Sequence, residues 1–182
     1  MARNKGHSLY FVCILMPDEA GMEVTAFKEE IATKFGSSYA LRTPPHITLI
    51  SPFEFPDEEI GTVTQLQDEA LWGYNPFDLQ LKGFGAFGNR VMYINVVQNV
   101  MLDAIYTQVV KAYKQLGKNI DVSKDFNPHA TIANRDLTQA RFDRAWPAFI
   151  NRQYNATFKV SEIHLLKHIE GRWQLFHASP LP

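Results

Sequence analysis

The chain has 182 residues, a length that fits one domain, and 46% of them are apolar, which is enough for a sizeable core. Its formal net charge of -1 excludes a general electrostatic attraction to long nucleic acids, which would need a strongly basic face. A small phosphorylated ligand suits this charge better.

The one cysteine and the apolar runs indicate the compartment. Cys13 lies inside the apolar run 9–16, so no disulfide can form within the chain, and a buried structural thiol is expected. The same run is too short to span a bilayer, and no cleavable signal is recognised near it. We therefore expect a cytoplasmic protein with no membrane partner.

Apolar spacing and turn residues predict five elements in the first half of the chain. They are a strand over 9–16, a helix over 17–35 that ends at Gly36, a strand over 39–50 closed by Ser51-Pro52, a helix over 57–70 and a strand over 77–82. Gly88-Asn89 is a hairpin signal that leads into the second half.

The second half predicts the same order with one more strand. Its elements are a strand over 91–97, a helix over 102–116, a loop over 118–127, a strand that begins near 128, a helix capped by Asp136 and shortened by Pro147, and strands over 157–166 and 172–178 joined at Glu170-Gly171. The first strands of the two halves start at Leu9 and Val91.

One short motif occurs once in each half. Pro45-His46-Ile47-Thr48-Leu49 returns as Pro128-His129-Ala130-Thr131-Ile132. The offset between the two histidines agrees within one position with the offset between the two first strands, which indicates an internal duplication. Successive side chains of a strand point to opposite faces, so the histidine and the threonine of each motif share one face while the apolar residues point to the other. Both motifs therefore predict an imidazole and a hydroxyl on the face opposite the core, towards solvent or a cleft.

These features predict an α+β fold in a single domain over 1–182. We expect two pseudo-symmetric lobes, about 9–86 and 91–178, with mainly antiparallel sheets flanked by helices. The lobes would form one cleft with His46 and His129 face to face. No linker rich in Pro, Gly or Ser separates the halves, so they should share one compact body.

With these paired motifs the sequence resembles the 2H phosphoesterase superfamily, in particular its 2′-5′ RNA ligase-like branch, which includes cyclic nucleotide phosphodiesterases. That family carries two His-x-Thr/Ser motifs on strands of two pseudo-symmetric lobes. The resemblance implies that His46 and His129 are catalytic, with His129 as base and His46 as acid in hydrolysis. It also implies that Thr48 and Thr131 bind the substrate phosphate.

The residue types explain the implied chemistry. Opening a 2′,3′-cyclic phosphate needs a base for water and an acid for the departing ribose oxygen, and two imidazoles supply both near neutral pH. The threonine hydroxyls can donate to the non-bridging oxygens of the phosphate. We expect no cofactor and no metal. The expected partner is a small nucleotide or an RNA end with a cyclic phosphate or a 2′-5′ linkage, bound by a monomer.

Other residues are candidates for substrate contacts. Many ligase-like members have an arginine five residues after the second histidine, where this chain has Asn134; Arg135 follows one position later, a shift that changes the face on a strand. Phe53 and Phe126 could stack on a base. Arg135, Arg42 and Lys82 could supply positive charge near a phosphate, and their plainer alternative is surface solvation. The plainer alternative for the phenylalanines is core packing, and for Trp173 it is a place in the core or at the rim.

Two alternatives concern function. His164 and His168 have a spacing that suits a metal on a helix, but the β pattern of 160–166 is stronger, so we do not expect a metal site there. The main hypothesis is a metal-independent phosphodiesterase acting on cyclic phosphates or 2′-5′ bonds, with reverse ligation allowed by microscopic reversibility. The alternative is a non-catalytic module that binds an RNA end or nucleotide in the same cleft.

Overall fold

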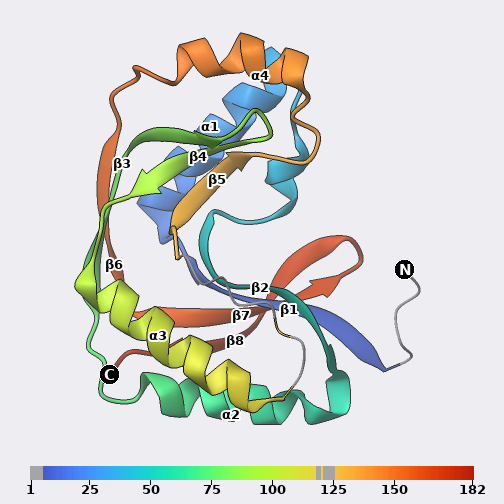
Figure 1. The fold of residues 1–182 in the computed structure, drawn as a ribbon, viewed down its shortest axis with the longest axis vertical. Coiled ribbons are helices and arrows are strands. Elements are labelled where there is room, and N and C mark those ends of the chain that lie inside the picture. The colour runs from blue at the N-terminus through green and yellow to red at the C-terminus, as the bar shows by residue number, and fades with distance from the viewer. Residues whose placement is uncertain (1–5, 118–119, 121–125) are drawn as a thin grey trace.

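The computed structural model describes residues 6–117, 120 and 126–182 (Figure 1). The expected loop 118–127 lies mostly outside these residues. The elements in chain order are β1 His7–Leu15, α1 Asp18–Phe35, η1 Tyr39–Arg42, β2 His46–Pro56, η2 Asp57–Glu59, α2 Ile60–Leu71, β3 Phe77–Phe87, β4 Val91–Val96, α3 Val100–Gln115, β5 His129–Ala133, α4 Gln139–Ala145, η3 Trp146–Ala148, β6 Asn155–Val160, β7 Glu162–Ile169 and β8 Arg172–Pro180, where η marks a 3-10 helix.

The described strands form one curled antiparallel sheet in the order β6-β3-β4-β5-β2-β1-β7-β8. The two strands that begin with the His-x-Thr motifs, β2 and β5, are neighbours at its centre. Helices pack on this sheet, so the predicted α+β class is confirmed.

The helices form two pairs at opposite ends of the molecule (Figure 1). α1 packs with α4 and against β5 and β6, whereas α2 packs with α3 and against β8. The third strand of the first half, β3, pairs with β4 and β6 of the second half. Each end of the molecule therefore contains elements from both halves of the chain, residues 9–86 and residues 91–178.

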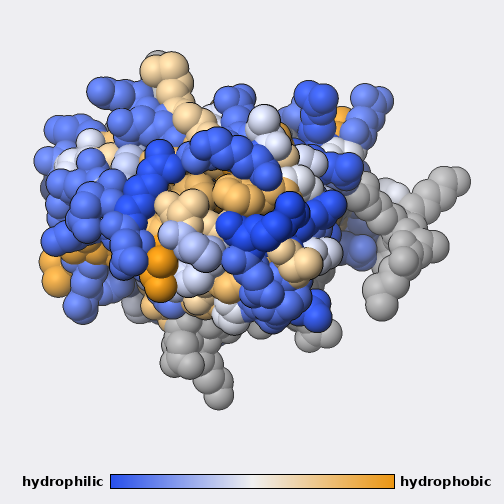
Figure 2. All heavy atoms as spheres, turned by 90° about the horizontal axis from the view of Figure 1, so that it is seen from above, coloured by the Kyte–Doolittle hydropathy of each residue, from blue (hydrophilic) through white to orange (hydrophobic). Residues whose placement is uncertain are grey.

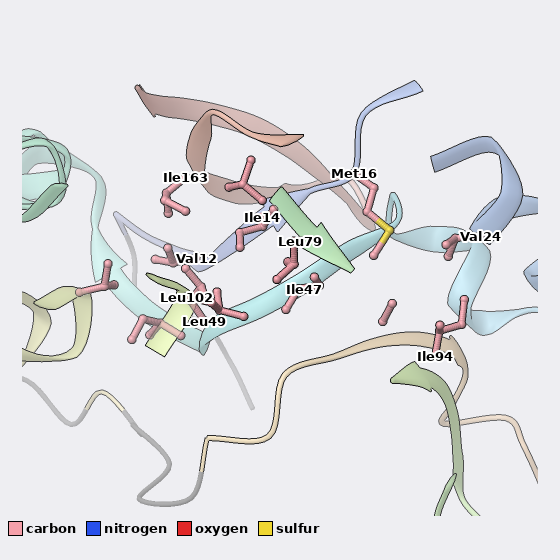
Figure 3. Packing of buried hydrophobic residues seen from close by; sticks show 14 of the residues in the cluster. Val12, Ile14, Met16, Val24, Ile47, Leu49, Leu79, Ile94, Leu102 and Ile163 are labelled. Atoms are coloured by element: carbon pink, nitrogen blue, oxygen red, sulfur yellow. The ribbon is translucent and has the colours of Figure 1, made fainter. Parts of the chain in front are cut away.

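The main core lies on the face of the sheet opposite the motif side chains. Ile47 and Leu49 of β2 enter it beside Val12 and Ile14 of β1 and Leu102 of α3 (Figure 3). The alternate residues of β1 form a second, smaller cluster, in which Phe11 and Cys13 are buried with Leu166. The strand predicted over 9–16 is therefore buried on both of its faces, and Cys13 is the buried thiol that the sequence predicted.

β2 begins and ends later than the sequence predicted. It continues through Ser51-Pro52 to Pro56, whereas the segment 39–42 is a 3-10 helix. The β1–β2 register shifts between the pairs Tyr10–Phe53 and Val12–Ile50, which leaves an extra residue in β2. A bulge of this kind accommodates a proline, whose missing N–H removes one ladder hydrogen bond.

Two predictions for the C-terminal part are wrong. Asp136 does not cap α4, because Thr138 does so by accepting from the Arg141 N–H, and the Asp136 carboxylate bonds elsewhere. The strand predicted over 157–166 is two strands that separate at Ser161, since β6 pairs with β3 and β7 with β1. The alternation of apolar residues along 157–166 does not show that the chain leaves one strand and enters another with a different partner.

The chain-reversal predictions are confirmed. Gly36 ends α1 with a φ of 78°, and Gly88 joins β3 to β4 with a φ of 55°. Glu170 and Gly171 both have positive φ in the turn between β7 and β8, as a two-residue hairpin needs. Within the described residues, no helix is long and apolar enough to cross a membrane.

Candidate active site

The two His-x-Thr motifs lie side by side on the neighbouring strands β2 and β5 at the centre of the sheet. Ile47 of β2 pairs with Ala130 of β5 in antiparallel register. Continuing this register by one residue in each direction places the histidine of each motif opposite the threonine of the other, at the spacing of neighbouring strands. The pairs are His46 with Thr131 and His129 with Thr48.

Both imidazoles are held in the same way. Nδ1 of His46 lies 2.7 Å from the carbonyl oxygen of Pro44, and Nδ1 of His129 lies 2.8 Å from that of Asn127. A carbonyl can only accept, so Nδ1 carries the proton in each ring. Nε2 of each neutral imidazole is therefore the nitrogen free to accept a proton.

Each imidazole also packs against an aromatic ring from the adjacent strand. Phe11 of β1 lies 5.1 Å from the His46 ring, and Tyr93 of β4 lies 5.1 Å from the His129 ring, between ring centroids. Phe11 and Tyr93 are both the third residue of their predicted first strands, counted from Leu9 and Val91, so they occupy matching positions of the repeat. Each motif histidine thus has the same two contacts, a carbonyl oxygen at Nδ1 and an aromatic ring on the adjacent strand.

Burial makes both histidines harder to protonate in the free protein. Burial is the largest cause for His46, and together with the positive charges of Lys28 and of protonated His129 it lowers the pKa of His46 to about 4, against the opposing hydrogen bond to Pro44. Burial likewise lowers the pKa of His129. Both rings are therefore neutral near pH 7 until an anion favours their protonation.

The motifs open on a cavity of about 210 Å³. It is lined by Phe11, Lys28, Tyr39, Ala40, Thr43, His46, Thr48, Pro52, Thr131, Asn134, Arg135 and Trp173. His129 does not line the cavity itself, but its protonated form disfavours protonation of His46, and it shares one face of β5 with Thr131. The hydroxyls of Thr48 and Thr131 make no hydrogen bond within the part of the chain that the structure describes, so both are available to a ligand.

Three comparisons relate this chain to known proteins. The model of the family described as 2′-5′ RNA ligase superfamily matches residues 16–172. The chain belongs to the 2′-5′ RNA ligase superfamily.

Its relatives in this superfamily are distant. A protein of Bacillus cytotoxicus named "Putative phosphoesterase" is 28% identical over 148 residues, which cover 80% of this chain and 83% of that protein. The RNA 2′,3′-cyclic phosphodiesterase of Geobacillus stearothermophilus is 27% identical over 173 residues, or 88% of this chain, and the match spans 52% of that protein.

Solved structures share the fold. TT0787 of Thermus thermophilus has a TM-score of 0.70 at 19% identity, with 95% of this chain and 97% of that chain covered. LigT of E. coli without ligand has a TM-score of 0.69 at 19% identity, with 96% and 98% covered.

Arg135 lines the cavity although it lies one position after Asn134, the position at which many ligase-like members have an arginine. β5 ends at Ala133, so the alternation of a strand no longer fixes the side-chain direction. Arg135 has a φ of 49°, a left-handed conformation that is uncommon outside glycine and often found at functional sites. Its guanidinium lies 4.9 Å from the ring centroid of Tyr39, and Arg42 lies 5.0 Å from the same ring.

Asp136 connects the two segments that carry Tyr39 and Arg135 on this side of the cavity. Its carboxylate accepts hydrogen bonds from Ser37 Oγ at 2.7 Å and from the N–H groups of Ser38 at 2.9 Å and Tyr39 at 3.0 Å. Burial opposes ionisation, but these hydrogen bonds outweigh it and lower the pKa of Asp136. The bonds join the start of η1 to the end of β5, two segments from different halves of the chain.

Lys28 of α1 is a charged cavity residue that the sequence analysis missed. Its side chain is 2% exposed, and Nζ donates to the Thr43 carbonyl at 2.9 Å. Burial lowers the pKa of Lys28 to about 8. A signal was present in the sequence, because Lys28 falls with Val24 and Ile31 on the apolar stripe of the helix.

The other candidate contacts lie elsewhere. Phe53 is 5% exposed and packs in the main core against Tyr113, because the bulge keeps its ring on the helix-covered face. Phe126 stacks on Tyr106 at 3.8 Å and also packs against the core. Neither lines the cavity, and the same is true of the exposed side chains of Arg42 and Lys82. Packing was the alternative for both phenylalanines.

The other histidine pair lies on β7, as the β pattern predicted. His164 Nδ1 accepts from the N–H of Leu15 at 3.2 Å, while its Nε2 lies 3.4 Å from Glu162. His168 packs against Trp173. Among residues 6–117, 120 and 126–182, no three His, Cys, Asp or Glu side chains gather as a metal-ligand group.

Proposed function

We propose that this chain is a metal-independent phosphodiesterase that hydrolyses 2′,3′-cyclic phosphates or 2′-5′ phosphodiester bonds of nucleotides or RNA ends. The observation that carries the proposal is the pair of imidazoles held alike through Nδ1, with two free threonine hydroxyls between them. A relative named RNA 2′,3′-cyclic phosphodiesterase and a LigT structure with 3′-AMP support this substrate class.

The proposed reaction needs two proton transfers. One Nε2 takes a proton from water as the water oxygen bonds to phosphorus. The other imidazole, protonated at Nε2, gives its proton to the ribose oxygen as the bond from phosphorus to that oxygen breaks. The product is a phosphomonoester with a free neighbouring hydroxyl. Joining a cyclic phosphate to a hydroxyl is the same ring opening with that hydroxyl in place of water. The reverse of this joining is cleavage of a 2′-5′ bond, in which the neighbouring ribose hydroxyl attacks the phosphorus, the cyclic phosphate forms again, and the two imidazoles exchange roles.

The neighbouring groups would act on the phosphate. The hydroxyls of Thr48 and Thr131 donate to the non-bridging oxygens, which holds the phosphorus in line and stabilises the charge of the transition state. Arg135 supplies positive charge from the cavity wall. All these groups belong to one chain, which is consistent with a monomer as the active species.

The assignment of acid and base has two competing arguments. The family resemblance names His129 as base and His46 as acid. The charge of Lys28 disfavours protonation of His46, which argues for His46 as the neutral base. We adopt the electrostatic assignment as the one to test.

The deciding experiment is hydrolysis of a panel of 2′,3′-cyclic nucleotides and 2′-5′ dinucleotides in the presence of chelator. We expect turnover that chelator leaves unchanged and added divalent metal does not increase. Binding of the nucleotides without turnover would favour the alternative, a non-catalytic module. A rate that chelator abolishes and metal restores would contradict the two-histidine mechanism.

A further inference from the structure

Lys28 is a buried cation with too few partners. Its ammonium group has three N–H donors, and the Thr43 carbonyl at 2.9 Å accepts from one of them. No carboxylate forms an ion pair with it within the described part of the chain, where Glu30 of the same helix binds Lys34 and Arg152 instead. A buried charge without a partner is unfavourable, so such a group points to a ligand of opposite charge.

The position of Lys28 connects this charge to the motifs. Its side chain lines the same cavity as His46, Thr48 and Thr131, and its positive charge lowers the pKa of His46. The offset between the first strands aligns Lys28 with Val110, and the offset between the histidines aligns it with Lys111, which is exposed and does not line the cavity. The site is therefore symmetric in its imidazoles and asymmetric in its charge.

We propose that Lys28 is a phosphate-binding residue, whose ammonium group donates to the substrate phosphate from the His46 side of the cavity. The proposal rests on the proposed function for its substrate and deepens it, because it names a group that fixes which way the phosphate lies between two similar imidazoles. The phosphate supplies the missing counter-charge, and the protein supplies a dry, low-dielectric setting in which that charge pair is strong.

Surface appearance does not reveal this residue. Seen from the α1–α4 end, the molecule shows hydrophilic residues around a smaller apolar area (Figure 2). Many lysines of the chain are exposed, and Lys34 of the same helix is an exposed lysine that pairs with Glu30. Lys28 differs from these because it is at once buried, charged and part of the cavity wall.

The test compares Lys28→Met, which keeps the length and loses the charge, with Lys28→Arg and with the control Lys34→Met. Calorimetry gives the dissociation constants for inorganic phosphate and 3′-AMP, and the melting temperature reports folding. We expect Lys28→Met to weaken the binding of both ligands at least tenfold. Lys28→Arg should keep most of the wild-type affinity, and Lys34→Met should have the wild-type affinity. The melting temperature of Lys28→Met should stay equal or rise, because removal of an unpaired buried charge relieves its desolvation cost.

A merely structural lysine would give another pattern. NMR titration should show a higher pKa of His46 in Lys28→Met than in the wild type, and no change in Lys34→Met. Phosphate affinity within twofold of the wild type in folded Lys28→Met would overturn the proposal. If Lys28→Met has a lower melting temperature, binding is compared at a temperature at which all variants are folded. A stable Lys28→Arg variant that binds phosphate as weakly as Lys28→Met would also overturn the proposal. Binding is measured without turnover, so an inactive wild type that binds phosphate through Lys28 would refute the proposed function alone.

Discussion

Ile47 pairs with Ala130 at the centre of the sheet, and this pairing alone sets the two His-x-Thr motifs side by side in opposite directions. The antiparallel order matters because a parallel pairing would place the two histidines directly opposite each other. In the observed order each imidazole has a hydroxyl across from it. A phosphate among the four groups would therefore meet alternating proton-transfer and hydrogen-bonding groups.

The first prediction concerns the two imidazoles. His46→Ala or His129→Ala should lower kcat for a 2′,3′-cyclic nucleotide by about a hundred- to ten-thousand-fold, since each removes one proton-transfer partner. The double variant should be little slower than either single one, because acid and base act as a unit. Phosphate binding should change far less. Initial rates in chelator, with calorimetry for binding, measure both effects.

His177→Ala is the matched control for these variants. His177 is also a partly exposed strand histidine, but its Nε2 lies 2.8 Å from Asp68, away from the cavity. Its removal should leave kcat unchanged. A near wild-type rate in both His46→Ala and His129→Ala would contradict the proposed function, whatever the effect on binding.

A second prediction follows from the lowered pKa values of His46 and His129. The free protein holds both rings neutral near pH 7, whereas catalysis needs one proton on the pair. The bell-shaped profile of kcat/KM should therefore have its maximum below about pH 6.5, the ordinary pKa of histidine. The anionic phosphate raises both pKa values once it is bound, so the maximum of kcat should lie at higher pH.

Full profiles of both constants test this shift. The limbs belong to the coupled pair rather than to one named ring. Coincident maxima for kcat and kcat/KM would show that phosphate binding does not change the protonation of the histidines.

Much of the site was predictable because local rules govern it. The motif alternation placed His46 and Thr48 on one face, and the matching offsets of strands and histidines indicated the repeat. What escaped prediction depends on contacts between distant residues. Asp136 looked like a helix cap, yet its carboxylate binds Ser37 to Tyr39, and Phe53 could not be assigned to the core without the bulge in β2.

Arg135 illustrates a different limit. Strand alternation would have turned its side chain away from the cavity, but β5 ends at Ala133 and the left-handed backbone at Arg135 replaces the strand rule. A sequence pattern does not state where a strand ends to within one residue. Lys28 escaped because a lysine on a helix is assigned to solvent by default, even on an apolar stripe.

A third prediction uses the close approach of Gly85 to Tyr93. The two residues are opposite each other in β3 and β4, and a Cβ at Gly85 would lie 2.5 to 2.8 Å from atoms of the Tyr93 ring. Gly85→Ala must therefore displace the ring that packs on His129, at a cost of about 1–3 kcal/mol in the free energy of unfolding. We expect kcat to fall while phosphate binding is kept.

Gly61→Ala is the control, because a Cβ at Gly61 in α2 meets no atom within 4 Å. It should leave kcat unchanged and stabilise the helix slightly. Adding Tyr93→Leu to Gly85→Ala should recover stability, since it removes the ring that clashes. Unchanged kcat and unchanged stability in Gly85→Ala would show that the Tyr93 ring does not position His129.

A fourth prediction concerns the Asp136 hydrogen bonds. Asp136→Ala leaves three donors without their acceptor and should lower the free energy of unfolding by about 1–3 kcal/mol. Because the pKa of Asp136 is lowered on folding, its contribution is present above the unfolded pKa near 3.9 and is lost as pH falls through the folded value. Denaturation at pH 7 and at lower pH measures this difference.

The same substitution should weaken phosphate binding, since Tyr39 packs against Arg135. Asp57→Ala provides a comparison, because Asp57 accepts from Ser8, Tyr10 and Lys167 in a cluster away from the cavity. It should lower stability and leave phosphate binding unchanged. Equal effects of both substitutions on phosphate affinity would refute a specific role for Asp136 in the cavity wall.

The last prediction separates the acid from the base. An aryl phosphodiester such as bis(p-nitrophenyl) phosphate releases a stable anion, so its leaving group needs no proton, whereas the ribose oxygen of a cyclic nucleotide does. Removal of the acid should therefore cost much less on the aryl ester than on the cyclic nucleotide, and removal of the base should cost the same on both. The charge of Lys28 beside His46 assigns the base to His46. We expect His129→Ala to keep most of its activity on the aryl ester and His46→Ala to lose it on both substrates. The opposite pattern would assign the acid to His46, as the family resemblance implies.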